Sequence, residues 1–420
     1  MKRLRPFFLL LSLVPALASG AGEARPEDVG LSSERLSRIK AYALAEVEKG
    51  RIAGAVSLVA RRGHIVHLSA VGKADIEEGR ELREDSVFRI ASMTKPIVSL
   101  AVMMLHEEGR FLLDDPISKF IPELAKPRVA VVHEGDPVAP QALQTVPAAR
   151  EITIHDLLTH QSGLTYGFLN QGPVGDLYRR ARLVENVTDN EELIRRLSEL
   201  PLVHHPGTAF QYSHSTDVLG RVVEVVSQQN LDRFLAERIL DPLGMKDTKF
   251  YLSAEDADRL VTLYQRGETP PLKPLERARE SRVVLGPKTF FSGGGGLVST
   301  ARDYFRFLQM LLNGGELDGT RLVSAKTVEL MTIDHVGKEI NIYPGYGFGL
   351  GFAVRQELGK GRSLGSEGDY TWGGIFNTVF WVDPEEELIL VFLTNFSPYD
   401  LDQRWYVKAL VYQAITQSFQ

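Results

Sequence analysis

Residues 87–105 read Val-Phe-Arg-Ile-Ala-Ser-Met-Thr-Lys-Pro-Ile-Val-Ser-Leu-Ala-Val-Met-Met-Leu, and this stretch decides how the rest of the chain is interpreted. A short β-like run precedes Ser92, and an apolar pattern with helical spacing follows it. Pro96 fits only in the first turn of a helix, so we expect that helix to start near Ser92. Positions three apart share a helix face, so the Ser92 hydroxyl and the Lys95 amine should meet.

A serine and a lysine in this arrangement are a candidate nucleophile and base. A serine hydroxyl needs a neighbour to take its proton, and a partly buried lysine can do so. The helix N-terminus also favours negative charge on the Ser92 oxygen. Taken alone the spacing is weak evidence, because an N-cap serine followed by an exposed Lys95 would produce the same pattern.

Composition narrows the class of protein. The 420 residues are 44% hydrophobic and 24% charged, as in a soluble globular protein. The chain has no cysteine, which excludes disulfides, cysteine-ligated zinc and a thiol nucleophile. Its formal net charge of −6 argues against nucleic acid as a partner, because phosphate binding needs clustered lysine and arginine.

The N-terminal stretch is typical of a secretory signal. Lys2, Arg3 and Arg5 precede a largely apolar run over 7–17, with small residues near its end. We expect a signal peptide over 1–20, a periplasmic or secreted protein, and no stable membrane insertion once the signal is removed. The alternative is an N-terminal anchor that stays in place. Removing three positive charges would take the net charge from −6 to −9.

Strand patterns occur at both ends of the chain. The runs 55–60 and 65–71 form one expected hairpin, and 378–382 and 388–393 form another. A further strand is expected over 348–354. These patterns predict an α+β fold in which both chain ends build one antiparallel sheet, flanked by helices. The N-terminal helix is expected to begin at a Ser33 cap.

The middle of the chain has a different character. Short helical patterns alternate with polar loops, so we expect a mostly helical region over 116–285. The segment 129–151 has no clear period and is interpreted as a lid-like loop. The sheet region would then comprise 21–115 and 286–420.

Two further motifs accompany Ser92-Met93-Thr94-Lys95. Phe-Gln-Tyr-Ser-His at 210–214 leads into a helical pattern, and Trp-Gly-Gly at 372–374 precedes the C-terminal hairpin. In this order the three motifs resemble those of the serine β-lactamase and penicillin-binding-protein superfamily, especially its class C-like branch with the family VIII carboxylesterases. Segments 157–164 and 293–300 look like further landmarks of that family. The resemblance implies a β-lactamase/transpeptidase-like fold.

The resemblance implies that Tyr212 exchanges a proton with Ser92 and the leaving group. A phenol titrates near 10 in water, so it needs a cation such as Lys95 beside it to act near neutral pH. The alternative for Tyr212 is a core tyrosine. Whether Lys95 or Tyr212 is the principal base stays open, because the pair would titrate as a unit.

The third motif implies the oxyanion hole and part of the pocket. By analogy with the family, the backbone N–H groups of Ser92 and Ile375 would hold the oxyanion. Gly373 and Gly374 would let substrate lie against the strand, and Trp372 would wall the pocket. The alternative for Trp372 is an aromatic residue packed in the core.

Two departures from the β-lactamase pattern bear on the substrate. His214, expected in the pocket, stands where those enzymes carry asparagine, and Trp372 stands where they carry lysine. The missing lysine removes a cation that would meet a substrate carboxylate, so a neutral ester should bind better than a β-lactam. Tyr166, Phe168 and Tyr343 could line an acyl pocket together with Tyr346, although loop and strand aromatics are common.

The sequence therefore predicts a serine hydrolase without metal or cofactor that forms an acyl-enzyme with short-chain carboxylic esters. The enzymatic alternative is a β-lactamase, D-amino-acid peptidase or amidase; an alternative of another class is a catalytically silent binding or scaffold module. The sequence does not support three other kinds of site. The Gly-x-Ser-x-Gly motif of α/β-hydrolases is absent, and His204-His205 lacks a third zinc ligand. No lysine follows the glycines at 293–296, as a phosphate-binding loop would require.

Overall fold

The computed structural model describes residues 24–131, 143–185, 187–267, 272–286, 288–337, 340 and 342–418. The signal peptide expected over 1–20 lies outside these ranges. Within them, no helix is both long enough and apolar enough to cross a membrane.

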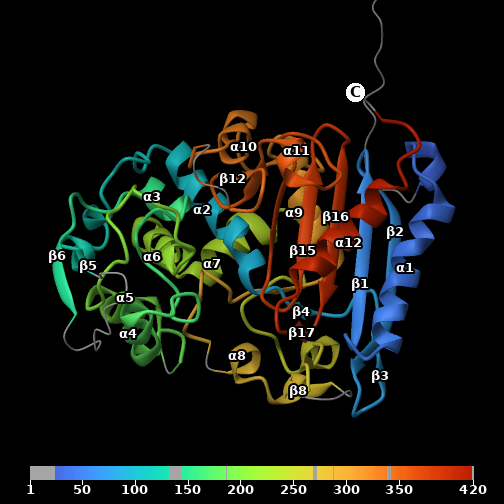
Figure 1. Ribbon diagram of the computed structural model, residues 1–420, viewed down its shortest axis with the longest axis horizontal. Coiled ribbons are helices and arrows are strands. Elements are labelled where there is room, and N and C mark those ends of the chain that lie inside the picture. Colours follow the sequence, from blue (N-terminus) through green and yellow to red (C-terminus); the bar gives the residue numbers. More distant parts are fainter. Residues whose placement is uncertain are drawn as a thin grey trace, which may run out of the picture.

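The centre of the molecule is an eight-stranded antiparallel sheet (Figure 1). Its spatial order is β12 (Tyr346–Phe348), β13 (Ala353–Arg355), β14 (Tyr370–Gly373), β15 (Val379–Asp383), β16 (Leu388–Thr394), β1 (Gly54–Arg61), β2 (His64–Asp75) and β3 (Arg80–Glu81). The two chain ends meet where β1 pairs with β16, with Val56 opposite Leu393. The predicted α+β architecture and the sheet built from both chain ends are confirmed.

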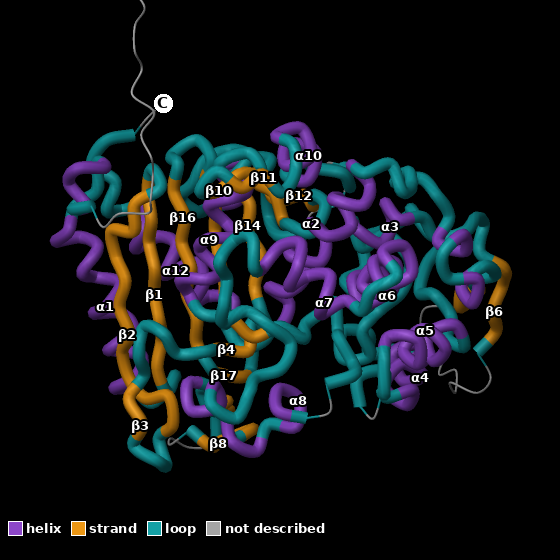
Figure 2. Tube along the Cα trace, turned by 180° about the vertical axis from the view of Figure 1, so that it is seen from behind, coloured by secondary structure: helices purple, strands orange, loops and turns teal. Residues whose placement is uncertain are grey.

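Helices cover both faces of this sheet (Figures 1 and 2). Because side chains alternate along a strand, Val56 and Leu58 of β1 join one apolar cluster, while Ala55 and Val59 join another. The second cluster includes residues of α1 (Ser33–Glu48) and α12 (Leu401–Tyr412), and the first includes residues of α9 (Ala301–Leu312). The sheet is therefore the middle of three layers.

A second group of helices lies beside the sheet and positions the site. It consists of α2 (Thr94–Glu107), α3 (Ile154–Leu158), α4 (Pro173–Ala181), α5 (Asn190–Ser198), α6 (Ser215–Ser227) and α7 (Leu231–Leu235). Helix α6 packs against α2, α3, α5 and α7. The packing of α6 on α2 brings the segment before α6, which carries Tyr212, next to the start of α2.

Shorter elements complete the described chain. The strands are β4 (Phe88–Arg89) with β9 (Val298–Ser299), β5 (Arg128–Val131) with β6 (Gln144–Pro147), β10 (Glu316–Leu317) with β11 (Thr320–Arg321), and β7 (Leu263–Gln265) between β8 (Lys273–Glu276) and β17 (Phe396–Ser397). The short helices are α8 (Arg282–Leu285), α10 (Ala325–Met331), α11 (Leu358–Gly361), a π-turn Ala236–Leu240, and 3₁₀ turns at Pro26–Val29, Ala91–Met93, Ile117–Lys119, Pro122–Leu124, Asp256–Arg259 and Ala278–Glu280.

Local expectations differ from the structure in three places. The cap of α1 is Ser32, whose side chain accepts from the Arg35 N–H, and not Ser33. The segment 348–354 is not one strand: it turns through Gly351, at φ +103°, between β12 and β13. The segment 129–151 contains most of β5 and all of β6, which pair with each other, while 132–142 lies outside the described residues. The boundaries proposed for the two regions stay a prediction.

Candidate active site

Ser92 lies in a tight turn between a strand and a helix. The 3₁₀ turn Ala91–Met93 connects β4 to α2, which begins at Thr94, two residues later than expected. Ala91 has φ +46°, a conformation that costs energy for any residue with a side chain. Pro96 occupies the first turn of α2, as its sequence position predicted. This turn places the nucleophile candidate at the start of a buried helix.

Lys95 contacts several other residues of the site. Its side chain is buried, with 1% of the residue exposed, and its ammonium nitrogen has three acceptors. It lies 2.6 Å from the Gly294 carbonyl oxygen, 3.1 Å from the Tyr166 hydroxyl and 3.2 Å from the Ser92 hydroxyl. Three ammonium hydrogens are thus matched by three oxygens. The predicted meeting of Ser92 and Lys95 is present in the structure.

Tyr212 lies on the other side of Lys95. The Lys95 ammonium nitrogen is 4.6 Å from the centre of the Tyr212 ring, and the Trp372 indole N–H donates to the Tyr212 hydroxyl at 3.2 Å. The ammonium over the ring and the indole N–H on the hydroxyl oxygen fix the position of the phenol. The three residues proposed for catalysis therefore lie together, and Trp372 contacts one of them directly.

Tyr166 is a site residue that the motif analysis placed only in a possible acyl pocket. Burial, reinforced by Asp217 and Tyr212, holds the pKa of Tyr166 well above its ordinary value, so its phenol stays neutral while accepting from Lys95. Phe168 stacks on its ring at 5.1 Å. The sequence signal was its position two residues after the landmark at 157–164, which is too general to identify a lysine partner.

His214 does not face an open pocket. It is buried, with 4% exposed; its Nδ1 lies 2.9 Å from Asp217, and its ring packs against Tyr166 at 4.3 Å. Asp217 also accepts from the Ser292 hydroxyl at 2.6 Å and the Gly294 N–H at 2.8 Å. His214 therefore acts on the site through the Asp217 carboxylate, a group that the sequence analysis did not single out.

The charge of Asp217 is secured by these donors. Burial acts to raise the pKa of Asp217, but the hydrogen bond and charge of His214, with the charge of Lys95, bring it below its ordinary value. The carboxylate is ionised and holds Gly294, whose carbonyl accepts from Lys95. Burial, followed by the charge of Lys95, keeps the pKa of the neighbouring His160 well below its usual range, so that imidazole is neutral.

The third motif lies beside the nucleophile turn. A side chain at Gly374 would meet the Ile90 carbonyl oxygen at 2.4 Å, so only glycine allows β14 to approach the residues before Ser92 this closely. Ile375 lies in the turn between β14 and β15, with 42% of its surface accessible. Among the described residues, neither the Ser92 N–H nor the Ile375 N–H donates to a protein acceptor. Both amides are available to a ligand oxygen.

The chemistry of the site is set by the groups that it brings together. In the described ranges, no group of three or more histidine and acidic side chains could hold a metal ion. The constellation contains a hydroxyl, an ammonium, two phenols and two unpaired amides. Such a set can exchange a proton and stabilise an oxyanion, as acyl transfer requires.

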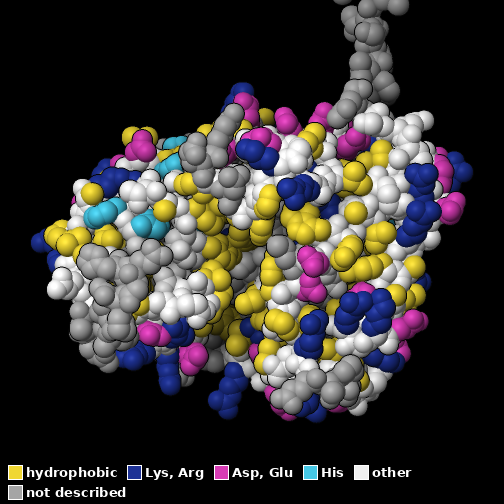
Figure 3. All heavy atoms as spheres, in the orientation of Figure 1, with side chains coloured by type: hydrophobic (Ala, Val, Ile, Leu, Met, Phe, Trp, Pro, Cys, Tyr) yellow, Lys and Arg dark blue, Asp and Glu magenta, His cyan; other side chains and the backbone are white. Residues whose placement is uncertain are grey.

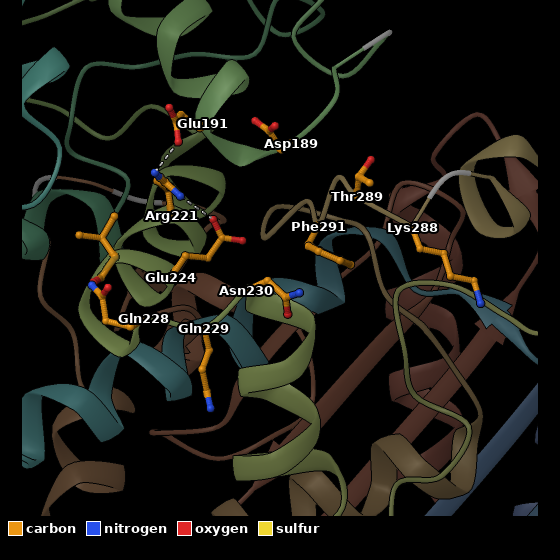
Figure 4. Close-up of a pocket in the computed structure, with 11 residues that line it drawn as sticks. Asp189, Glu191, Arg221, Glu224, Gln228, Gln229, Asn230, Lys288, Thr289 and Phe291 are labelled. Atoms are coloured by element: carbon orange, nitrogen blue, oxygen red, sulfur yellow. Dashed lines mark hydrogen bonds and ion pairs between the residues drawn. The ribbon is translucent and has the colours of Figure 1, made fainter.

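The surface near the site is apolar, and a separate cavity is polar. On the face shown in Figure 3, hydrophobic side chains gather where the helical part meets the sheet. A cavity of about 750 Å³ lies instead at the C-terminal end of α6, where Arg221 pairs with Glu191 and Glu224 (Figure 4). Asp217, in the first turn of α6, faces the catalytic group. The polar cavity is therefore not the candidate active site.

In this fold, a serine in the turn between a strand and a helix, next to a buried lysine and a tyrosine, defines a serine hydrolase of the β-lactamase type. The chain belongs to the β-lactamase family, whose model matches residues 39–413.

Three known proteins are similar over most of their length. Protein Rv1367c of Mycobacterium tuberculosis (strain ATCC 25618 / H37Rv) is 39% identical over 367 residues, which covers 84% of this chain and 88% of that one. Esterase EstB of Burkholderia gladioli is 35% identical over 386 residues, covering 88% and 91%. The solved structure of EstCE1, a hydrolase with promiscuous acyltransferase activity, has a TM-score of 0.75 at 27% identity, covering 91% and 99%.

Proposed function

We propose that this chain is a serine carboxylesterase that hydrolyses short-chain esters through an acyl-enzyme on Ser92. The observation that carries the proposal is the contact of Lys95 with Ser92 at 3.2 Å, inside a buried site that also holds Tyr212 and Trp372. The similarity to Esterase EstB and to the hydrolase EstCE1 supports ester hydrolysis as the reaction.

In the acylation step, the Ser92 oxygen attacks the ester carbonyl carbon as its proton moves to the Lys95–Tyr212 pair. The carbonyl oxygen becomes an oxyanion, and the free N–H groups of Ser92 and Ile375 are the donors available to it. The C–O bond to the alcohol then breaks, and the alcohol leaves with the proton. Water attacks the acyl carbon in turn, delivers a proton to the same pair, and releases the acid while Ser92 regains its hydrogen.

Trp372 underlies the preference for neutral esters. Its indole donates to Tyr212 and so occupies, beside the phenol, the place where the sequence comparison expected lysine in a β-lactamase. The ammonium of Lys95 is already surrounded by protein acceptors. A carboxylate next to the scissile bond would therefore meet no unpaired lysine there, and desolvating it would be unfavourable.

The test compares wild type with Ser92→Ala on p-nitrophenyl butyrate and on a chromogenic cephalosporin. Ester turnover that greatly exceeds cephalosporin turnover, and that is lost in the variant, is the expected result. The opposite preference would identify a β-lactamase. Turnover of neither substrate would favour a peptide substrate or a binding module. Ester turnover retained by Ser92→Ala would refute the assignment of Ser92 as the nucleophile.

We also propose that the protein is exported, on the basis of the basic and apolar pattern of residues 1–20. N-terminal sequencing of protein recovered from a periplasmic or culture fraction of a bacterial host tests this. A mature chain that begins after the apolar run is expected; an intact N-terminus confined to the cytoplasm would contradict export.

A further inference from the structure

A groove of about 940 Å³ opens on the side of the sheet that carries β12. It lies between the loop before β12, the short helix α11 and the start of α12. Tyr343, Lys360, Arg362, Ser363 and Trp405 are among the residues that line it.

Aromatic rings connect this groove to the active site. Tyr343 lines the groove, and its ring centre is 6.2 Å from that of Trp405 and 6.3 Å from that of Trp372. The Trp372 ring is in turn 5.2 Å from the Tyr212 ring. The four rings form a row of contacts from the catalytic phenol into the groove. Trp372 is buried, with 6% exposed, so an apolar chain attached to a bound ester would contact mainly the partly exposed rings of Tyr212, Tyr343 and Trp405.

The far part of the groove is positively charged. Lys360 is paired with Glu357 at 2.8 Å, whereas Arg362 is exposed and makes no ion pair within the described residues. Figure 3 shows Lys and Arg side chains beside hydrophobic ones in the region of α11. An unpaired guanidinium at the end of an apolar surface is suited to a carboxylate.

The wall that carries Arg362 is held by a buried ionic cluster. Arg355 donates to the carbonyl oxygen of Ser363 at 2.9 Å and pairs with Asp369 at 2.9 Å. Lys408 also pairs with Asp369, at 2.7 Å. Two cations share the Asp369 carboxylate here, so this cluster fixes the backbone next to Arg362.

We infer that this groove binds the remote end of the substrate, so that the enzyme also accepts esters longer than the short-chain ones proposed above and selects those whose apolar chain ends in a carboxylate. The inference rests on the proposed esterase function. In this inference the cation that binds the substrate anion is Arg362, at the outer end of the aromatic row. The third-motif lysine of a β-lactamase is absent beside the scissile carbonyl, because Trp372 stands in its place. The enzyme should therefore bind a substrate whose carboxylate lies at the far end of the acyl chain, but not one whose carboxylate lies next to the ester.

Two substrates with the same chain test this: p-nitrophenyl octanoate and the p-nitrophenyl monoester of suberic acid, whose chain ends in a carboxylate. The variant is Arg362→Asn, because residue 362 has φ +48° and asparagine tolerates that backbone. Lys326→Gln, which removes an exposed charge on α10 outside the groove, is the control.

Wild type should hydrolyse the suberate monoester with kcat/KM at least equal to that of the octanoate. Arg362→Asn should lower the ratio of the two kcat/KM values about fivefold to tenfold, mostly through KM of the monoester. Added salt should reduce the wild-type ratio in the same direction. An unchanged ratio in Arg362→Asn, or an equal change in Lys326→Gln, would overturn the inference. Failure of the wild type on both of these esters and on p-nitrophenyl butyrate would instead refute the proposed function, whereas turnover of the butyrate alone would overturn only the inference.

Discussion

The ammonium nitrogen of Lys95 lies 3.1 Å from the hydroxyl oxygen of Tyr166, a tyrosine outside all three sequence motifs. The Tyr212 phenol, which belongs to the second motif, instead presents its ring to the same ammonium at 4.6 Å. The two phenols therefore contact the lysine differently: the Tyr166 hydroxyl accepts a hydrogen bond from it, while Tyr212 presents its ring to it and accepts from the Trp372 indole N–H.

Removing the Tyr166 hydroxyl should weaken catalysis. In Tyr166→Phe, one hydrogen of a buried ammonium loses its acceptor, which costs about 1–3 kcal/mol and corresponds to roughly a tenfold or larger loss of kcat/KM. Steady-state kinetics on p-nitrophenyl butyrate measure this. Tyr370→Phe is the matched control, because the Tyr370 hydroxyl is buried without a hydrogen-bond partner in the described structure. Equal activity of both variants would show that Lys95 does not depend on Tyr166.

Trp372 should affect the rate through its hydrogen bond to Tyr212. Trp372→Phe keeps an aromatic ring but removes the N–H that donates to the Tyr212 hydroxyl oxygen, so the phenol loses a partner that fixes its position. We expect kcat on p-nitrophenyl butyrate to fall about tenfold. Trp381→Phe is the control, since the Trp381 N–H has no partner in the described part of the chain. An unchanged kcat in Trp372→Phe, or an equal loss in Trp381→Phe, would contradict this role.

Asp217 should be needed for both stability and activity. Asp217→Asn places an amide among three donors, from His214, Ser292 and Gly294, and so leaves buried groups unpaired. We expect the free energy of unfolding to fall by about 3 kcal/mol, and kcat/KM to fall because the Gly294 carbonyl positions Lys95.

Asp303→Asn separates these two effects. Asp303 is also buried and accepts from Asp247 and Thr248, neither of which contacts Lys95. Denaturant unfolding and ester kinetics of both variants should show lost stability in each, and lost activity beyond the fraction unfolded only in Asp217→Asn. Full specific activity of folded Asp217→Asn would argue against the positioning role.

Acid should destabilise the fold partly through His67. Burial, followed by the charge of Lys40, lowers the pKa of His67 to about 4, while the unfolded value is near 6.5. Below pH 6.5 the unfolded chain binds a proton that the folded chain does not, so stability falls as the pH falls towards 4. At pH 5 this group contributes about 2 kcal/mol of that loss.

His67→Gln keeps a polar partner for Ser57, which lies 2.8 Å from the imidazole, but removes the titration. Urea unfolding at pH 7 and at pH 5 should show a smaller loss of stability in the variant than in wild type, by about 2 kcal/mol. Identical losses in the two proteins would mean that His67 is protonated in the folded state.

The sequence was informative where a local pattern has one structural solution. The hairpins formed by β1 with β2 and by β15 with β16 followed from pairs of strand-like runs separated by short turns, and the family predicted from the three motifs is confirmed by the match of its model to residues 39–413. The segment 348–354 was misinterpreted because an apolar run containing glycine can be one strand or a tight turn between two. Only the pairing with neighbours decides this.

The site was predicted less completely than the fold. Ser92 and Lys95 are three residues apart, so helix geometry brings them together. Tyr166 contacts Lys95 directly, and Asp217 acts on it through Gly294. Both contacts require α6 to pack on α2 and the segment at 292–294 to lie beside these helices. Such partners depend on tertiary packing, as does the burial that turned His214 away from an open pocket.

The acyl-enzyme itself gives the most direct test of this account. Wild type and Ser92→Ala would be mixed with p-nitrophenyl butyrate, quenched in acid within the first turnovers, digested and analysed by mass spectrometry. The account predicts a butyryl group on the wild-type peptide that contains Ser92 and no acylated peptide in the variant. Rapid ester turnover with the acyl group on another residue, or an active Ser92→Ala, would contradict it.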